Sequence, residues 1–100
     1  MKKKDIIEKI LALVPTSKVA QSPALITFLD SLKPEEVSFV ATVMKMGKYN
    51  TLPGNFNTVF EEQKKREAKT LLESLAINAD LFEEIKKGLD ILKDQPIWDL

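Results

Sequence analysis

The sequence contains neither cysteine nor histidine. Their absence excludes disulfide bonds, thiolate nucleophiles, zinc sites built from Cys and His, and catalysis by Ser-His-Asp or Cys-His groups. It also excludes a histidine switch near neutral pH. A chain without cysteine is compatible with a reducing compartment, so we expect a cytoplasmic protein.

The chain has no excess of either charge and almost no arginine. Its 15 lysines and arginines equal its 15 aspartates and glutamates, and all the cations except Arg66 are lysines. An even balance gives no general attraction to nucleic acids or anionic membranes, and arginine is the usual reader of phosphates and bases. The composition therefore disfavours a nucleic-acid partner.

Long hydrophobic runs are missing as well. No stretch approaches the roughly 18 apolar residues of a transmembrane helix, and charged residues interrupt the N-terminal segment that would otherwise resemble a signal peptide. We expect no association with a membrane. The residues that are present, 44% hydrophobic and 30% charged over 100 positions, are typical of one globular domain.

The stretch PEEVSFVATVMKMGK, residues 34–48, predicts a helix at about 34–46. Pro34 suits the first helical position, because its missing N–H would have no partner within the helix. Gly47 is expected to end the helix in a left-handed conformation. Apolar residues cover roughly 220° of the circumference, so the helix should contact several neighbours. The residues on its polar side are Ser38, Thr42 and Lys45.

Helical spacing of apolar residues predicts four more helices. Ser22 before Pro23, and Thr58 with Glu61, are typical of helix starts. A glycine at position 88 lowers the stability of the last helix by about 1 kcal/mol relative to alanine. Close approach of another helix, or a local kink, would explain why a glycine is found there. We predict an all-α fold, a single compact five-helix bundle-like domain whose central helix (about 34–47) is buried. The other four helices are expected at about 3–14, 23–32, 58–76 and 80–93.

Candidate binding residues lie in the loop GKYNTLPGNFN, residues 47–57, and in the apolar tail, residues 94–100. Long loops are often functional, and aromatic anchors favour interfaces. The alternatives are that the asparagines stabilise turns, that Pro53-Gly54 forms a turn with positive φ at the glycine, and that the tail folds back over the bundle. The candidate binding surface comprises Lys48, Tyr49, Asn50, Asn55, Phe56 and Trp98.

Charged clusters in the fourth and fifth predicted helices allow two further interpretations. A basic cluster suits a phosphate site, but acidic residues are interleaved with it, which favours a self-neutralised solvated face. The pairs Glu61-Glu62 and Glu83-Glu84 suggest carboxylate or di-metal chemistry, yet the sequence contains no Glu-x-x-His. We therefore predict no catalytic residue, metal ligand or cofactor site, and no enzyme. The basic cluster consists of Lys64, Lys65, Arg66 and Lys69.

The order of motifs is also informative. SPALITFLDSL leads to PEEV and an apolar helix ending in Met46-Gly47-Lys48, and the pair Leu71-Leu72 precedes an acid-rich helix ending in Gly88-Leu89. Over about residues 22–93 this order resembles a family of short, uncharacterised bacterial helical domains, a domain of unknown function. The resemblance implies a helical fold and no known activity. Lysine at position 48 stands where the family has arginine, which weakens the argument for a bidentate anion site.

Two functions remain open. The first is a non-enzymatic protein-interaction or regulatory module that engages another protein or a second copy of itself. It rests on the apolar surface of the central helix, the apolar tail and the missing catalytic groups. The alternative is a small-ligand or nucleic-acid binder that uses the loop at 47–57 and the basic face of the fourth helix.

Overall fold

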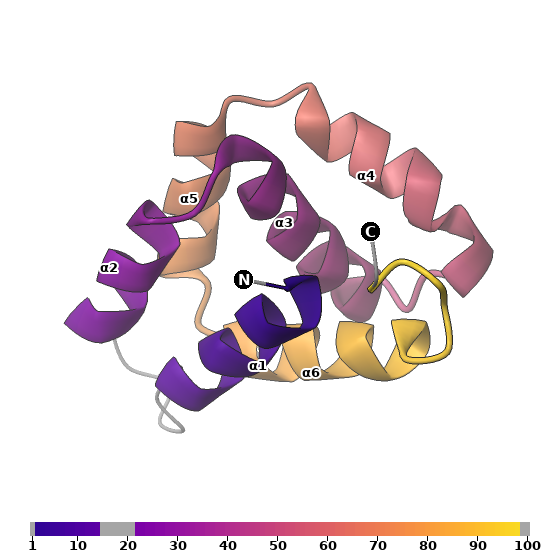
Figure 1. The fold of residues 1–100 in the computed structure, drawn as a ribbon, viewed down its shortest axis with the longest axis horizontal. Coiled ribbons are helices and arrows are strands. Elements are labelled where there is room, and N and C mark those ends of the chain that lie inside the picture. Colours follow the sequence, from indigo (N-terminus) through magenta and orange to yellow (C-terminus); the bar gives the residue numbers. More distant parts are fainter. Residues whose placement is uncertain (1, 15–21, 99–100) are drawn as a thin grey trace.

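The structure, a computed structural model, describes residues 2–14 and 22–98. This part of the chain forms helices and no strand, which confirms the predicted all-α class (Figure 1). The described residues form six α-helices where five were expected. The elements are α1 (Lys3–Leu13), α2 (Pro23–Asp30), α3 (Pro34–Lys48), the 3₁₀ helix η1 (Pro53–Asn55), α4 (Phe56–Lys64), α5 (Ala68–Ile77) and α6 (Leu81–Leu92).

Helix α3 is the buried central helix that the sequence predicts. It packs against α1, α4, α5 and α6 (Figure 1), and nearly every residue from Val37 to Gly47 is buried. Pro34 occupies its first turn, and the backbone N–H of Lys33 donates to Oε1 of Glu36 at 2.8 Å. The N-terminal signals in the sequence therefore start this helix where expected.

The polar side of α3 is covered as well. Ser38 Oγ donates to the carbonyl oxygen of Pro34 at 3.1 Å, and Thr42 Oγ1 donates to that of Ser38 at 2.7 Å. Both hydroxyl groups therefore donate a hydrogen bond inside their own helix. This allows neighbouring helices to pack over a face that the sequence marks as polar.

Gly47 does not end α3, contrary to the prediction. The helix continues through Lys48, and neither Gly47 nor Gly54 has a positive φ. Asn50 takes the left-handed conformation instead, with a φ of 50°. The N–H of Thr51 then donates to the carbonyl oxygen of Met46 at 3.0 Å, a bond typical of a Schellman helix end.

Gly47 is needed for packing. A Cβ atom on Gly47 would overlap the backbone of Glu84 in α6, and a Cβ atom on Gly88 would overlap the backbone of Val43 in α3. The two helices therefore cross with their backbones in contact, at a point where no side chain fits between them. This confirms the close approach that Gly88 suggests. We call this contact the glycine crossing, formed by Val43, Gly47, Glu84 and Gly88.

The prediction of one helix at 58–76 is wrong, because this part of the chain forms two helices, α4 and α5. Helix α4 ends at Lys64, Glu67 is extended, and α5 begins at Ala68. Thr58 lies inside α4, where Asn55 holds the N-cap position. The bend lets both α4 and α5 pack on α3.

The tail folds back over the bundle as far as residue 98. Ile97 is buried, and Trp98 Nε1 donates to the carbonyl oxygen of Leu92 at 2.9 Å. The Trp98 ring also meets Phe39 of α3 edge-on, with 5.5 Å between the ring centroids. The folded-back alternative is thus confirmed for this part, and residues 99–100 of the predicted tail lie outside the described residues.

Gln63 of α4 leads to a stability prediction. Its side chain is buried, and its Oε1 atom has no hydrogen-bond partner. A buried unsatisfied acceptor costs about 1–3 kcal/mol. Methionine has a similar length and no amide, so we expect Gln63→Met to raise the free energy of unfolding by about 1 kcal/mol. Urea denaturation measures this, with Gln63→Glu as the variant that should destabilise. A loss of stability in Gln63→Met would contradict the prediction.

Candidate functional site

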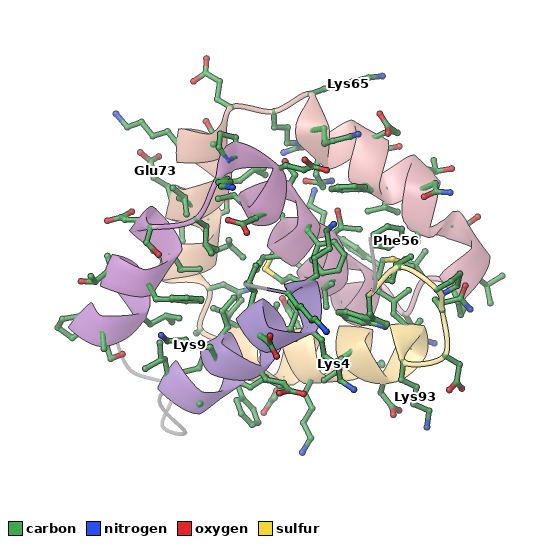
Figure 2. All side chains as sticks on the ribbon, viewed as in Figure 1. Lys4, Lys9, Phe56, Lys65, Glu73 and Lys93 are labelled. Atoms are coloured by element: carbon green, nitrogen blue, oxygen red, sulfur yellow. The ribbon has the colours of Figure 1, made fainter. Side chains whose placement is uncertain are left out.

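Two of the six candidate residues contribute mainly to the core. Phe56 is only 5% exposed, and its ring lies 5.7 Å from that of Phe39 and 5.4 Å from that of Phe60. Trp98 is half-buried against the same Phe39 ring. Both aromatics pack on the Phe39 ring of α3, Phe56 from α4 (labelled in Figure 2) and Trp98 from the tail, so neither presents a whole ring to solvent.

Two others lie at helix ends. Asn50 is exposed and supplies the left-handed residue that follows α3. Asn55 is exposed at the N-cap position of α4. The position of Asn50 agrees with the alternative in which the asparagines stabilise turns, whereas the Asn55 side chain makes no capping hydrogen bond.

Lys48 and Tyr49 remain as exposed side chains of the candidate surface. Tyr49 is 66% exposed, and the Lys48 Nζ atom lies 5.5 Å from the centroid of its ring. Both residues line a groove of about 350 Å³. We call it the α3–α5 groove, lined by Ala41, Met44, Lys45, Lys48, Tyr49, Arg66, Leu71, Ser74, Ile77 and Asn78.

Helix α3 and the bend between α4 and α5 bring the cations of this groove together. Lys45 and Lys48 lie in the last turn of α3, where positive charge meets the negative end of the helix dipole. Arg66 comes from the bend between α4 and α5, where its N–H donates to the carbonyl oxygen of Gln63 at 3.0 Å. The bend that sequence reasoning missed therefore places Arg66 at the groove.

The charges in this groove are close enough to influence each other. Burial lowers the pKa of Lys45 from its usual value, and the positive charges of Arg66 and Lys48 lower that pKa further. The carboxylate of Glu62 opposes this effect. The cations thus repel one another, with partial compensation from one acid.

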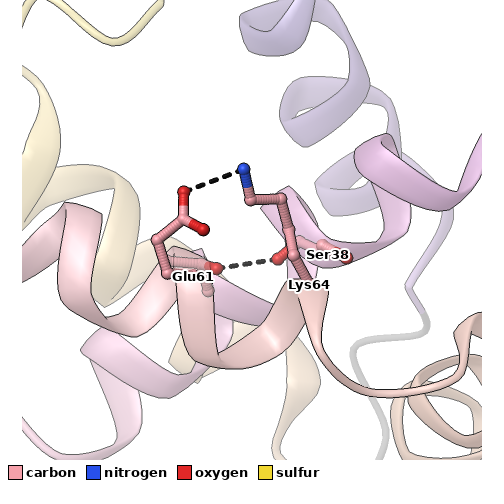
Figure 3. Close-up of polar contacts among 4 residues, drawn as sticks. Ser38, Glu61 and Lys64 are labelled. Carbon is pink, nitrogen blue, oxygen red and sulfur yellow. Dashed lines mark hydrogen bonds and ion pairs between the residues drawn. The ribbon is translucent and has the colours of Figure 1, made fainter.

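The predicted basic cluster is divided by the bend. Glu61 forms an ion pair with Lys64 at 2.8 Å (Figure 3), and this hydrogen bond is the main reason that the pKa of Lys64 is raised. Lys65 extends outward at the bend (Figure 2), whereas Arg66 lines the groove. The cluster therefore does not act as one basic face.

The apolar part of the groove also contains a residue that sequence reasoning missed. Met44 and Leu71 are buried and form its floor, while Ile77, at the end of α5, is 83% exposed. Tyr49 and Ile77 together give the groove an apolar rim. In the sequence, Ile77 is one apolar residue that follows the regularly spaced apolar positions of its helix. Single apolar residues of this kind are common on protein surfaces, so the sequence offered no reason to select it.

A larger depression, of about 720 Å³, lies between α1, α6 and the tail. It is lined by Leu89, Trp98 and charged residues of both signs, among them Lys4 and Lys93 (Figure 2). Lys93 lies 3.8 Å from a carboxylate oxygen of Asp90. The charges that line this depression are therefore of both signs. The ionisable side chains that line the α3–α5 groove, apart from Tyr49, are all cations.

Within residues 2–14 and 22–98, no group of three or more acidic side chains is close enough together to hold a metal ion. In the same part of the chain, no helix has the length and apolar character needed to cross a bilayer.

Comparison of the chain with protein-family models, with curated proteins and with solved structures gives no match. The resemblance of residues 22–93 to an uncharacterised bacterial helical family therefore stays a prediction.

Proposed function

We propose that this protein is a non-enzymatic interaction module, and that the α3–α5 groove is its contact surface for a partner protein. The occupant is a segment of the partner that presents an apolar side chain to Tyr49 and Ile77. The absence of cysteine favours the cytoplasm as the compartment where it acts.

One observation carries the proposal. Tyr49 and Ile77 are the exposed large hydrophobic side chains of the groove, at 66% and 83%, and they belong to different helix ends. Exposed apolar side chains gathered at a concave surface are typical of interaction sites. The sequence argument for a binding surface rested on the apolar central helix and the apolar tail. In the structure, α3 and the described part of the tail pack into the core, so these apolar surfaces do not face a partner.

Site-specific photocrosslinking tests this proposal. A photoreactive benzoyl-phenylalanine at position 77 should form an adduct with a partner protein in cells that carry the native chain, because this position is exposed at the groove. Leu52 is 73% exposed but does not line the groove, so the same group at position 52 is the matched control.

We expect an adduct from position 77 and none from position 52, and Tyr49→Ala should reduce its yield several-fold. The fold should tolerate this substitution because Tyr49 is exposed. Identical adducts from both positions, or none from position 77, would contradict the proposed contact surface.

A small anionic ligand or a nucleic acid is the second candidate function. The same three cations, Lys45, Lys48 and Arg66, favour it. A nucleic acid would bind with a steep dependence on salt, because counterion release dominates its affinity. Nuclease treatment before crosslinking would then abolish recovery of the complex.

A further inference from the structure

We propose that the α3–α5 groove recognises an acidic segment of the partner, in which a carboxylate side chain lies next to an apolar one. This inference rests on the proposed function and names the chemistry of its partner. The carboxylate is placed among Lys45, Lys48 and Arg66, and the apolar side chain against Leu71 and Ile77.

The cations define the polar half of the groove. Lys45 and Lys48 are three residues apart on α3 and therefore neighbours on one side of the helix, and Arg66 lines the same groove from the bend. Partial burial lowers the pKa of Lys45, and the positive charges of Arg66 and Lys48 lower it further. A carboxylate would relieve the repulsion among these cations and accept charge-assisted hydrogen bonds from the Arg66 guanidinium.

The apolar half adjoins the cations directly. Met44 and Leu71 close the floor, so that part of the groove has few polar atoms to satisfy. Lys48 is held above the Tyr49 ring at 5.5 Å, which places a cation at the apolar rim. A segment that alternates acidic and apolar side chains meets both halves at once.

Nucleic acid fits this surface less well. Ile77 and Leu71 line the groove but present no donor to a phosphate backbone. The groove, at about 350 Å³, is also near the lower end of the roughly 300–1,000 Å³ typical of small-molecule sites. Its size suits a few side chains.

Three fluorescent synthetic peptides test the inference by anisotropy with the full chain. The first alternates glutamate and leucine, the second has glutamine for every glutamate, and the third has serine for every leucine. We expect the first to bind, and the other two to bind at least about tenfold more weakly, because each loses one half of the recognition.

Two charge reversals locate the site. Arg66→Glu should weaken binding of the first peptide at least about tenfold. Lys65→Glu introduces the same change at the adjacent, outward-directed residue and should alter binding less than about twofold. Both positions are exposed, so circular dichroism should show unchanged helicity in each variant.

Each contrary result has a distinct meaning. Equal binding of the glutamate and glutamine peptides, or equal losses in Arg66→Glu and Lys65→Glu, would overturn acidic recognition at this groove. An adduct from position 77 that Arg66→Glu leaves unchanged would overturn this inference while the proposed contact surface stands. An adduct with a second copy of the chain, or one that nuclease removes, would overturn the acidic partner as well. If position 77 forms no adduct, the proposed function itself fails.

Discussion

Alanine at Gly88 should lower the free energy of unfolding by about 3 kcal/mol or more. Its methyl group would occupy the position of the Val43 backbone, which cannot rotate away as a side chain can. Overpacking of a core typically costs about 1–3 kcal/mol when side chains can adjust. Helix propensity alone would predict the opposite sign, a gain of about 1 kcal/mol over glycine. We expect the steric term to be larger, because the overlap involves main-chain atoms on both helices.

Thermal and urea denaturation measure this effect. A loss of about 3 kcal/mol in a domain of this size lowers Tm by roughly 12–24 °C. Gly47→Ala should behave similarly, since its methyl group would meet the Glu84 backbone at the same crossing. The losses in the double variant should not add, because both substitutions force apart the same pair of helices.

Gly54 provides the matched control. No atom lies within 4 Å of a Cβ built at this position, and its φ is not positive. Gly54→Ala should therefore change stability by less than about 1 kcal/mol, with a small gain from the reduced freedom of the unfolded chain. A Gly88→Ala variant as stable as Gly54→Ala would contradict the glycine crossing.

Aspartate at Val40 should unfold the protein at neutral pH. Val40 is fully buried on α3, and a carboxylate there would lose its hydration without gaining a partner. The cost of several kcal/mol is comparable with the roughly 5–15 kcal/mol that stabilises a typical domain. Val40→Ala, which removes apolar contacts but adds no charge, should cost only about 2–3 kcal/mol.

The pH dependence of the aspartate variant identifies the cause. Burial would raise the folded-state pKa of this carboxyl above the unfolded value of about 3.9. The penalty is therefore fully present above the raised pKa and decreases as the pH falls toward about 4, where the neutral acid is favoured in both states. Circular dichroism at pH 7.5 and pH 5 should show this partial recovery relative to the native chain.

Leu52→Asp is the control for this experiment. Leu52 is exposed, so the same new charge should alter stability by about 0.5 kcal/mol or less. A soluble Val40→Asp variant that melts cooperatively near the native Tm at pH 7.5 would contradict the central position of α3.

Helix α3 connects the core to the proposed binding surface. Its last turn carries Gly47 against α6, while Lys45 and Lys48 face the α3–α5 groove. At 3.6 residues per turn, Gly47 and Lys45 point in nearly opposite directions. The glycine crossing therefore holds the end of α3 in place, and the cations of the groove project from an anchored helix.

The sequence by itself determined the helical class, the starts of α2 and α3, and the burial of the central helix. These features are local, because proline and serine at a helix start and the spacing of apolar residues act within a few positions of the chain. Ser22 illustrates this, since its Oγ atom accepts the N–H of Leu25 at 3.2 Å as an N-cap should. Gly88 correctly predicted a close helix contact, although the sequence did not name the helix that approaches it.

Only the tertiary structure decided where the chain bends and which residues meet. Residues 61–67 contain no apolar side chain, so local propensity allowed one continuous helix, whereas packing of both α4 and α5 on α3 required a break. That break brings Arg66 to Lys45 and Lys48, which are about twenty positions away in the chain. The same packing places Gly47 at the glycine crossing, and Asn50 ends α3 in its place. The packing also buries Phe56 and part of Trp98 against Phe39. Contacts between distant segments depend on how whole helix faces fit together, and that fit cannot be derived from the spacing of residues along one helix.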